Sequence, residues 1–302
     1  MTPALTDTRK GVLAVIAAAT IWGFAPIYYR LLNHLPTADV LTHRIFWSFV
    51  FFAVVLAYRG RLGALKEAVT DRRQLGLIVL ASIFVSFNWF FFIYSIHVGK
   101  LTESSLGYYM FPLVSVVFGY VVFRERFTAV QWAAVGLAAV AVATLTFGLG
   151  VVPGISLILA TTFSAYGVVK KKLGTGPVVS VTAEVMVLLP VVLVWVIFFS
   201  SSQGLSTGTL ALLVLSGPLT GAPLILFSYA AQKAKLATVG LISYLNPTLQ
   251  FLVAAFIFVE PVTGWHLSAL IMIWIALAAY TWVALRQERE RSLTSASTVG
   301  TT

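Results

Sequence analysis

The chain has 302 residues, of which 59% are hydrophobic and only 10% are charged, and its formal net charge is +10. Soluble domains carry about 25% charged residues, so this chain has too few polar groups to cover a surface in water, and a soluble globular fold is excluded. The absence of cysteine excludes disulfides, thiolate metal sites and cysteine nucleophiles. The basic charge does not indicate nucleic-acid binding, because the Lys and Arg residues lie between apolar stretches and not on one folded basic face.

Apolar stretches follow one another from Gly11 to Leu285, and each is long enough to cross a hydrocarbon core about 30 Å thick. The first stretch is too long for the apolar region of a signal peptide and no small-residue cleavage site follows it, so we interpret it as a membrane span. Turn residues and charge clusters predict an all-α membrane protein with ten transmembrane helices: Gly11–Leu32, Ala38–Tyr58, Gln74–Val98, Thr102–Phe123, Ala129–Phe147, Val151–Val169, Val178–Ser200, Thr209–Gln232, Ala237–Val259 and Trp265–Leu285.

The connections between these spans differ sharply in charge. On one side of the membrane the connections and tails carry 17 Lys and Arg residues, whereas the other side carries Lys100 alone. Because short cytoplasmic loops are enriched in Lys and Arg, we expect both termini in the cytoplasm. Residues 1–10 would form an N-terminal tail, and residues 286–302 a cytoplasmic tail that starts as a helix end and is disordered after it.

The sequence also repeats itself at an offset of 135 residues. Because five spans separate the two copies, the second must be inverted relative to the first. This pattern predicts two inverted-topology five-helix halves, residues 11–147 and 148–285; chance similarity between apolar helices is the alternative. The matched pairs are Tyr94 and Tyr229, Lys100 and Lys235, Leu101 and Leu236, Leu106 and Leu241, Tyr109 and Tyr244, Pro112 and Pro247, Phe123 and Phe258, Glu125 and Glu260, and Thr128 and Thr263.

Two charged side chains lie well inside predicted spans, where insertion costs about 2.5–3.5 kcal/mol each. Arg44, with His43 beside it, lies six residues into the second span, and Glu184 lies six residues into the seventh. The two spans begin on opposite sides of the membrane, so each side chain is about 9 Å from a different face and no direct salt bridge between them is expected. We predict that Arg44 and Glu184 stabilise opposite ends of a central pathway.

The alternative is that each charge is tied to a nearby helix end. Arg44 would then pair with Asp39 or Glu103, and Glu184 with Lys170 or Lys171. Arg30 lies two residues from the end of its span and can reach the headgroups, so we interpret it as structural.

Six prolines fall inside the predicted spans, and the eighth span, with Pro218 and Pro223, is the most interrupted. Broken helices at membrane depth are typical of backbone that lines a cavity. Deep aromatic and amide side chains could line a pocket for a flat or amphipathic solute, although helix packing is the alternative for each. These candidates are Trp22, Asn88, Trp89, Tyr108, Tyr109, Tyr244 and Asn246.

Neither a Walker lysine loop nor an HExxH motif is present in the sequence. Their absence argues against ATP-driven chemistry and against a zinc membrane protease, and we expect no metal site and no enzymatic activity.

Several short strings of the sequence resemble the RarD proteins, a branch of the EamA-containing drug/metabolite transporter superfamily. The resemblance implies a ten-helix bundle of two inverted EamA-like halves in the bacterial inner membrane, which moves metabolites or drugs by alternating access. The family name is linked to chloramphenicol sensitivity. The chain departs from the family at Phe111, where the family has Asn before the proline, while Asn246 keeps the amide. The strings that carry the resemblance are Trp22–Pro26, Leu41–Arg44, Asn88–Phe90, Glu103–Tyr109, Tyr166–Lys172 and Leu188–Pro190.

These patterns together predict a secondary transporter, an exporter of small organic metabolites or drugs with a central cavity between the halves. Its partners would be the solute and the lipid bilayer, with no nucleic acid, and it would act as a monomer or homodimer. No cofactor is expected, but proton coupling through Glu184 or Glu103 is an option, because a carboxylate in low dielectric can titrate near neutrality. The alternatives are a non-transporting sensor or scaffold, for which the longest loop, Arg59–Arg73, is short, or an intramembrane enzyme, for which no nucleophile–base set is found.

Overall fold

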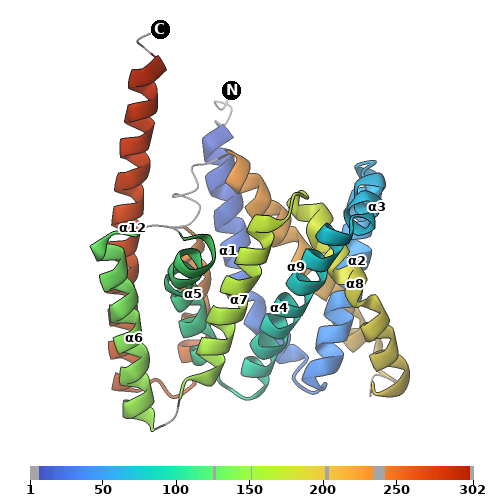
Figure 1. The fold of residues 1–302 in the computed structure, drawn as a ribbon. Helices are drawn as coiled ribbons and strands as arrows, with labels where there is room; N and C mark the ends of the chain where they lie inside the picture. Colours follow the sequence, from blue (N-terminus) through green and yellow to red (C-terminus); the bar gives the residue numbers. More distant parts are fainter. Residues whose placement is uncertain (1–6, 125–126, 151, 201–203, 234–241, 300–302) are drawn as a thin grey trace, which may run out of the picture.

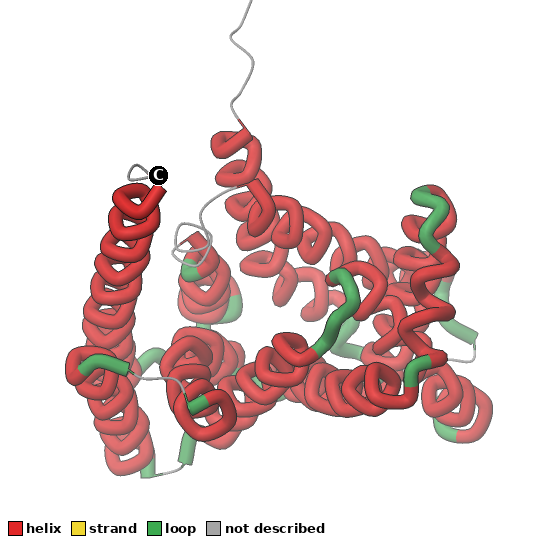
Figure 2. Tube along the Cα trace, turned by 45° about the horizontal axis from the view of Figure 1, so that its top comes forward, coloured by secondary structure: helices red, strands yellow, loops and turns green. Residues whose placement is uncertain are grey.

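The computed structural model describes residues 7–124, 127–150, 152–200, 204–233 and 242–299. Within these ranges the chain forms helices and loops and no strand (Figure 2). The helices are α1 (Asp7–Leu31), α2 (Thr37–Tyr58), α3 (Leu62–Thr70), α4 (Arg72–His97), α5 (Leu101–Phe123), α6 (Ala129–Leu149), α7 (Gly154–Lys172), α8 (Pro177–Phe198), α9 (Thr207–Lys233), α11 (Leu245–Leu252), the π-helix η1 (Val253–Ile257) and α12 (Gly264–Val299) (Figure 1).

The structure confirms an all-helical membrane chain. Six helices in the described residues are long and apolar enough to cross a membrane, and α5 is a seventh if its two bent halves form one span. Three shorter apolar helices, Gly154–Lys170, Leu245–Ile257 and Gly264–Tyr280, overlap the sixth, ninth and tenth predicted spans. Ten crossings of the membrane therefore stay a prediction.

Local sequence signals account for several helix ends. The Asp71 side chain accepts hydrogen bonds from the backbone N–H groups of Arg73 and Gln74 at 2.8 and 3.3 Å, so it caps the free donors at the start of α4. Thr128 and Gln131 form a reciprocal capping box at the start of α6. Gly150, with φ of 68°, ends α6 in the left-handed conformation that glycine adopts without strain.

Two segments outside the predicted spans contain helix. The loop Arg59–Arg73 contains the short helix α3, whose apolar side packs against α8. The tail after Leu285 begins as the end of a helix, as predicted, and α12 continues to Val299. Residues 286–299 contain no proline or glycine, so nothing in this sequence interrupts a helix that has already formed.

The prolines bend one helix and leave another continuous. The halves of α5 on either side of Pro112 meet at 45°, as expected where a proline removes a backbone hydrogen bond. In contrast, α9 runs unbroken through Pro218 and Pro223, so the predicted break in the eighth span was wrong. Membrane helices tolerate proline where neighbouring helices support the backbone, and Gly217 of α9 packs directly against the backbone of α2.

The helices pack in a set of recurring pairs, and α6 and α12 form one such pair at the edge of the bundle (Figure 1). The start of α1 and the end of α12 lie at the same end of the bundle (Figure 1). The connection between α6 and α7 lies at the other end. The main pairs are α5 with α7, α6 with α12, α1 with α9, α2 with α9, α4 with α7, α2 with α8, α1 with α11, α5 with α11 and α4 with α8.

A strained turn holds an acidic side chain at the start of α5. Val259 has φ of 53°, a conformation that β-branched residues rarely adopt, and Glu260 follows it. The Glu260 carboxylate accepts hydrogen bonds from the backbone N–H groups of Leu101 and Thr102 at 2.7 and 2.8 Å and from the Thr102 hydroxyl at 2.7 Å. It therefore satisfies helix donors that would otherwise lack partners.

The turn at Val259 has a counterpart in the first half of the chain. Among the described residues, Val259 and Arg124 are the two non-glycine positions with positive φ, each at 53°. They are separated by the 135-residue offset of the sequence repeat, and a matched glutamate follows each of them. The repeat positions Glu125, Lys235, Leu236 and Leu241 lie outside the described residues.

Close contact between α5 and α7 depends on Gly107. A Cβ at this position would lie 2.7 Å from the carbonyl oxygen of Ser156 and 3.1 Å from the Cβ of Leu159. Small residues let membrane helices approach closely in this way, so the contact fixes the spacing of these two helices.

We expect Gly107→Ala to lower the free energy of unfolding by about 1–3 kcal/mol, because the helix backbones must separate to admit the methyl group. The control is Gly136→Ala in α6, where nothing lies within 4 Å of the added Cβ. Thermal unfolding of the purified protein in detergent checks both variants. Equal melting temperatures for the two would contradict the proposed role of Gly107.

Candidate functional site

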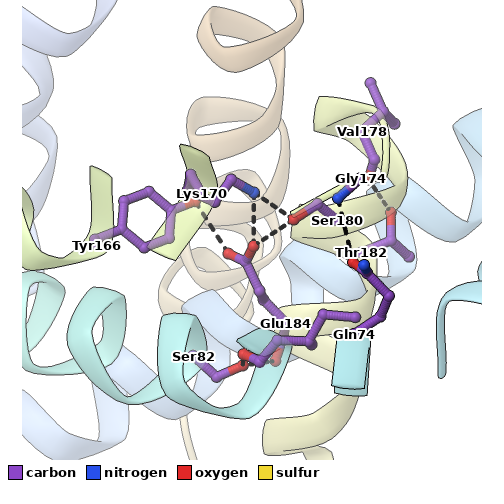
Figure 3. Close-up of polar contacts among 10 residues, drawn as sticks. Gln74, Ser82, Tyr166, Lys170, Gly174, Val178, Ser180, Thr182 and Glu184 are labelled. Atoms are coloured by element: carbon purple, nitrogen blue, oxygen red, sulfur yellow. Dashed lines mark hydrogen bonds and ion pairs between the residues drawn. The ribbon is translucent and has the colours of Figure 1, made fainter. Parts of the chain in front are cut away.

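Glu184 lies at the centre of a buried polar network between α7 and α8 (Figure 3). Its side chain is only 1% exposed, and its Oε1 accepts hydrogen bonds from Lys170 Nζ at 2.6 Å and from Ser180 Oγ at 2.7 Å. Its Oε2 accepts from the Tyr166 hydroxyl at 3.0 Å. The predicted alternative that Glu184 pairs with Lys170 is therefore what the structure shows.

Neighbouring helices complete this network, which we call the Glu184 network. Lys170 also donates to Ser180, and the Ser82 hydroxyl of α4 donates to the backbone oxygen of Glu184 at 3.0 Å. Sequence reasoning did not single out Tyr166 or Ser180. Their signal was the four-residue spacing from Lys170 and Glu184, which places each pair on one helix face.

Arg44 lies in a different environment. Its side chain is 7% exposed, and its guanidinium carbon is 4.3 Å from the centre of the Trp89 ring and 5.4 Å from that of Tyr29. Its Nε and Nη1 are buried without a hydrogen-bond partner among the described residues. Aromatic faces attract cations, but they do not replace the hydrogen bonds that a guanidinium makes in water.

The predicted acidic partners of Arg44 are engaged elsewhere. In the described part of the chain the ion pairs are Lys100–Glu103, at 3.0 Å, and Lys170–Glu184. Asp39 accepts a hydrogen bond from Trp195 Nε1 at 2.7 Å. Arg44 and Glu184 form no direct salt bridge, which confirms that prediction, whereas the alternative pairing of Arg44 with Asp39 or Glu103 is not observed.

Asn88 and Tyr108 lie near Arg44 but are satisfied within the protein. Asn88 Nδ2 donates to the backbone oxygen of Leu159 at 3.0 Å and to Thr162 Oγ1 at 3.1 Å, and its Oδ1 accepts from the Tyr108 hydroxyl at 3.1 Å. This amide therefore ties α4 to α5 and α7, and its direct role is structural.

A series of aromatic rings joins the surroundings of Arg44 to the Glu184 network. Neighbouring ring centres in this series, which we call the aromatic series, are 5.8–6.2 Å apart, within the range of favourable aromatic pairs. Lys170 Nζ lies 5.4 Å from the centre of the last ring. The rings are, in order, those of Tyr29, Phe92, Tyr108, Phe163 and Tyr166.

The remaining predicted residues make contacts elsewhere. The Tyr109 hydroxyl bonds Thr248 Oγ1 at 2.5 Å, and Trp22 packs against Phe227. Asn246 Oδ1 accepts from Gln250 Nε2 at 2.9 Å, within α11.

Two further candidates, Tyr244 and Glu103, contact the ends of helices, and His43 lies next to Arg44. Tyr244 offers its backbone oxygen to Thr248 Oγ1 at 2.7 Å, and Glu103 accepts from the Ile155 backbone N–H at 3.3 Å. His43 has a buried Nε2 without a described partner. The structure thus brings Arg44, Trp89, Asn88 and Tyr108 into one region, with His43 beside Arg44 on α2, and the remaining candidates lie outside the contacts that define it.

A cleft of about 180 Å³ lies between α2, α4 and α8. Apolar side chains such as Leu41, Ile45 and Val192 form most of its lining, so it lacks the convergent polar groups of a specific ligand site. Within the described residues no group of three or more His, Cys, Asp or Glu could hold a metal ion.

Comparison with known proteins shows which family the chain belongs to. The sequence model described as the EamA-like transporter family matches residues 9–147. The protein named RarD from Escherichia coli (strain K12) is 34% identical over 291 residues, which cover 95% of this chain and 98% of that protein. The chain belongs to the RarD branch of the EamA-type drug/metabolite transporters.

Other RarD relatives extend the likeness over nearly the whole chain. Protein RarD from Streptomyces exfoliatus is 37% identical and covers 94% of this chain and 91% of its own length. A relative from Pseudomonas aeruginosa named uncharacterized transporter PA0485 is 35% identical, with 95% and 98% covered. One solved crystal structure shares the fold at a TM-score of 0.62 and 18% identity, covering 92% of this chain and 98% of that one.

We expect Lys170→Met to lower the free energy of unfolding by about 3 kcal/mol, because it leaves the buried Glu184 carboxylate without its counter-ion. The double variant Lys170→Met, Glu184→Gln removes both charges, so its loss should be smaller than the sum of the two single losses. Thermal unfolding in detergent measures all three.

Lys172→Met is the matched control for these variants, because Lys172 is exposed and its removal should have little effect on stability. Additive losses in the double variant would show that Lys170 and Glu184 do not stabilise one another.

Proposed function

We propose that this protein is a secondary transporter that exports small organic molecules across the bacterial inner membrane by alternating access. Its membership of the RarD family supports a transporter of the drug/metabolite type. The observation that carries the mechanism is the pairing of helices, because alternating access in inverted repeats needs two related packings around one site.

The helix pairs support two inverted halves. If α1, α2, α4, α5 and α6 correspond in order to α7, α8, α9, α11 and α12, each of the main pairs between the halves has its exchanged counterpart. The α1–α9 pair corresponds to α7–α4, α2–α9 to α8–α4, and α1–α11 to α7–α5. The pairs α2–α8, α5–α11 and α6–α12 correspond to themselves, as they would across a pseudo-two-fold axis.

Backbone geometry gives independent support for this division. The equal φ values at Arg124 and Val259 occur at the same place in the two copies. The residues that match the family, 9–147, are close to the predicted first half, 11–147. The second half, 148–285, remains a proposal on these grounds.

We place both chain termini in the cytoplasm because the basic connections gather on that side. The Arg44 region is then near the outer face and the Glu184 network near the inner face. The aromatic series between them would line the route of the solute.

Proton coupling through Glu184 or Glu103 stays a proposal without direct support. The Glu184 carboxylate is held by Lys170, Ser180 and Tyr166. Coupling through Glu184 would therefore act on a carboxylate that joins α7 to α8.

Because the chain has no cysteine, a single introduced cysteine reports access to the centre of the bundle. Ser86→Cys lies half-buried in α4, two and three residues before Asn88 and Trp89. We expect a membrane-impermeant maleimide to label it from either side of oriented vesicles, and a transported solute to change the ratio of the two rates.

Gly136→Cys in α6, away from the Arg44 region, is the control, and its labelling should not respond to solutes. Labelling of Ser86→Cys from one side alone, unchanged by every solute tested, would contradict alternating access.

A further inference from the structure

Arg44 is a buried cation that forms no ion pair with any described residue. The acidic side chains of the bundle, in contrast, all have partners. The acidic residues at or within the membrane-spanning helices are engaged as follows. Asp39 binds Trp195, Glu103 binds Lys100 and the Ile155 backbone, Glu184 binds Lys170, and Glu260 caps α5.

Other unpartnered polar atoms gather around Arg44. Of the eight buried side-chain polar atoms without a partner in the described residues, five belong to His43, Arg44, Ser48 and Thr220. Ser48 lies one turn after Arg44 on α2, and Thr220 belongs to α9, which packs on α2 and places Thr220 against Tyr29. Buried polar groups are normally hydrogen-bonded, so this concentration marks a place built for a polar ligand.

The position of Arg44 argues against contact with lipid. Its neighbours Tyr29 and Trp89 come from α1 and α4, and its charge also acts on the Tyr108 hydroxyl of α5. A side chain that is 7% exposed among four helices does not reach out to the headgroups. None of the described acidic side chains pairs with it, which leaves its donors available to a molecule that enters the bundle.

We propose that Arg44 binds the carboxylate of the transported solute, and that the solute is an organic anion with a flat apolar body. A guanidinium offers paired donors that match a carboxylate in bidentate geometry. The Trp89 and Tyr29 rings provide the apolar surface beside it, and the hydroxyls of Ser48 and Thr220 provide further donors. This proposal rests on the proposed transport function and specifies its substrate class.

The test compares three probes with one ring and different charge: phenylacetate, phenylacetamide and phenethylamine. We expect phenylacetate to raise the melting temperature of the purified protein in detergent by about 3 °C when it is well above its dissociation constant. The neutral amide and the cationic amine should not. Arg44→Met should weaken phenylacetate binding by about 30-fold or more, and Arg44→Lys should retain part of it.

Arg30→Met is the matched control. Arg30 is an exposed arginine whose Nη1 donates to the Ile96 backbone oxygen at 3.3 Å, and its replacement should leave the phenylacetate effect unchanged. Without ligand, Arg44→Met should be at least as stable as the native protein, because it removes an uncompensated buried charge. A ligand site, and not a structural arginine, gives this result.

Several outcomes would overturn the proposal. These are equal stabilisation by the amide, an undiminished effect in Arg44→Met, no effect of phenylacetate, or a large loss of stability in ligand-free Arg44→Met. Stabilisation by phosphatidylglycerol alone that depends on Arg44 would assign the site to a lipid headgroup and would also overturn it.

The Ser86→Cys labelling assay separates this proposal from the transport function. If phenethylamine or phenylacetamide changes the labelling ratio and phenylacetate does not, transport stands and the anionic solute is wrong. If no solute changes the ratio, the transport function itself fails.

Discussion

A charge inside this bundle must find its partner within the protein, because hydrocarbon offers none. Three acidic side chains of the described residues meet this constraint by joining separate segments of the bundle. Glu184 holds α7 to α8 through Lys170, Asp39 holds α2 to α8 through Trp195, and Glu260 holds the chain before α12 to the start of α5. These polar contacts therefore help to determine which helices pack together, because the apolar surfaces of the helices resemble one another.

Arg44 departs from this pattern, so the two ends of the bundle interior differ in their electrostatics. One end holds a carboxylate that is fully paired, and the other holds a guanidinium that has aromatic contacts and unused donors. Rings from several helices connect the two ends. An apolar residue at position 44 would make the protein more stable. The presence of Arg44 there is consistent with a functional role that outweighs this loss of stability.

The sequence could predict the apolar helices, the absence of an Arg44–Glu184 pair and the pairing of Glu184 with Lys170, since these follow from hydropathy, depth and helix spacing. It could not predict that Tyr29 and Trp89 would surround Arg44, because the choice of partners depends on how α1, α2 and α4 rotate against one another. Hydropathy also does not show that packing against neighbouring helices keeps α9 continuous through Pro218 and Pro223. A helix end after Leu285 could be predicted, but not that α12 continues to Val299, because charge and low hydropathy do not determine where a helix ends.

The turns at Arg124 and Val259 share one unfavourable backbone conformation although their side chains have nothing in common. Glycine would adopt that conformation without strain, yet neither position has it. If the halves descend from a duplicated ancestor, the course of the main chain at this corner has outlasted the residues that form it. Internal symmetry in such proteins would then be traced better through torsion angles than through amino-acid identity.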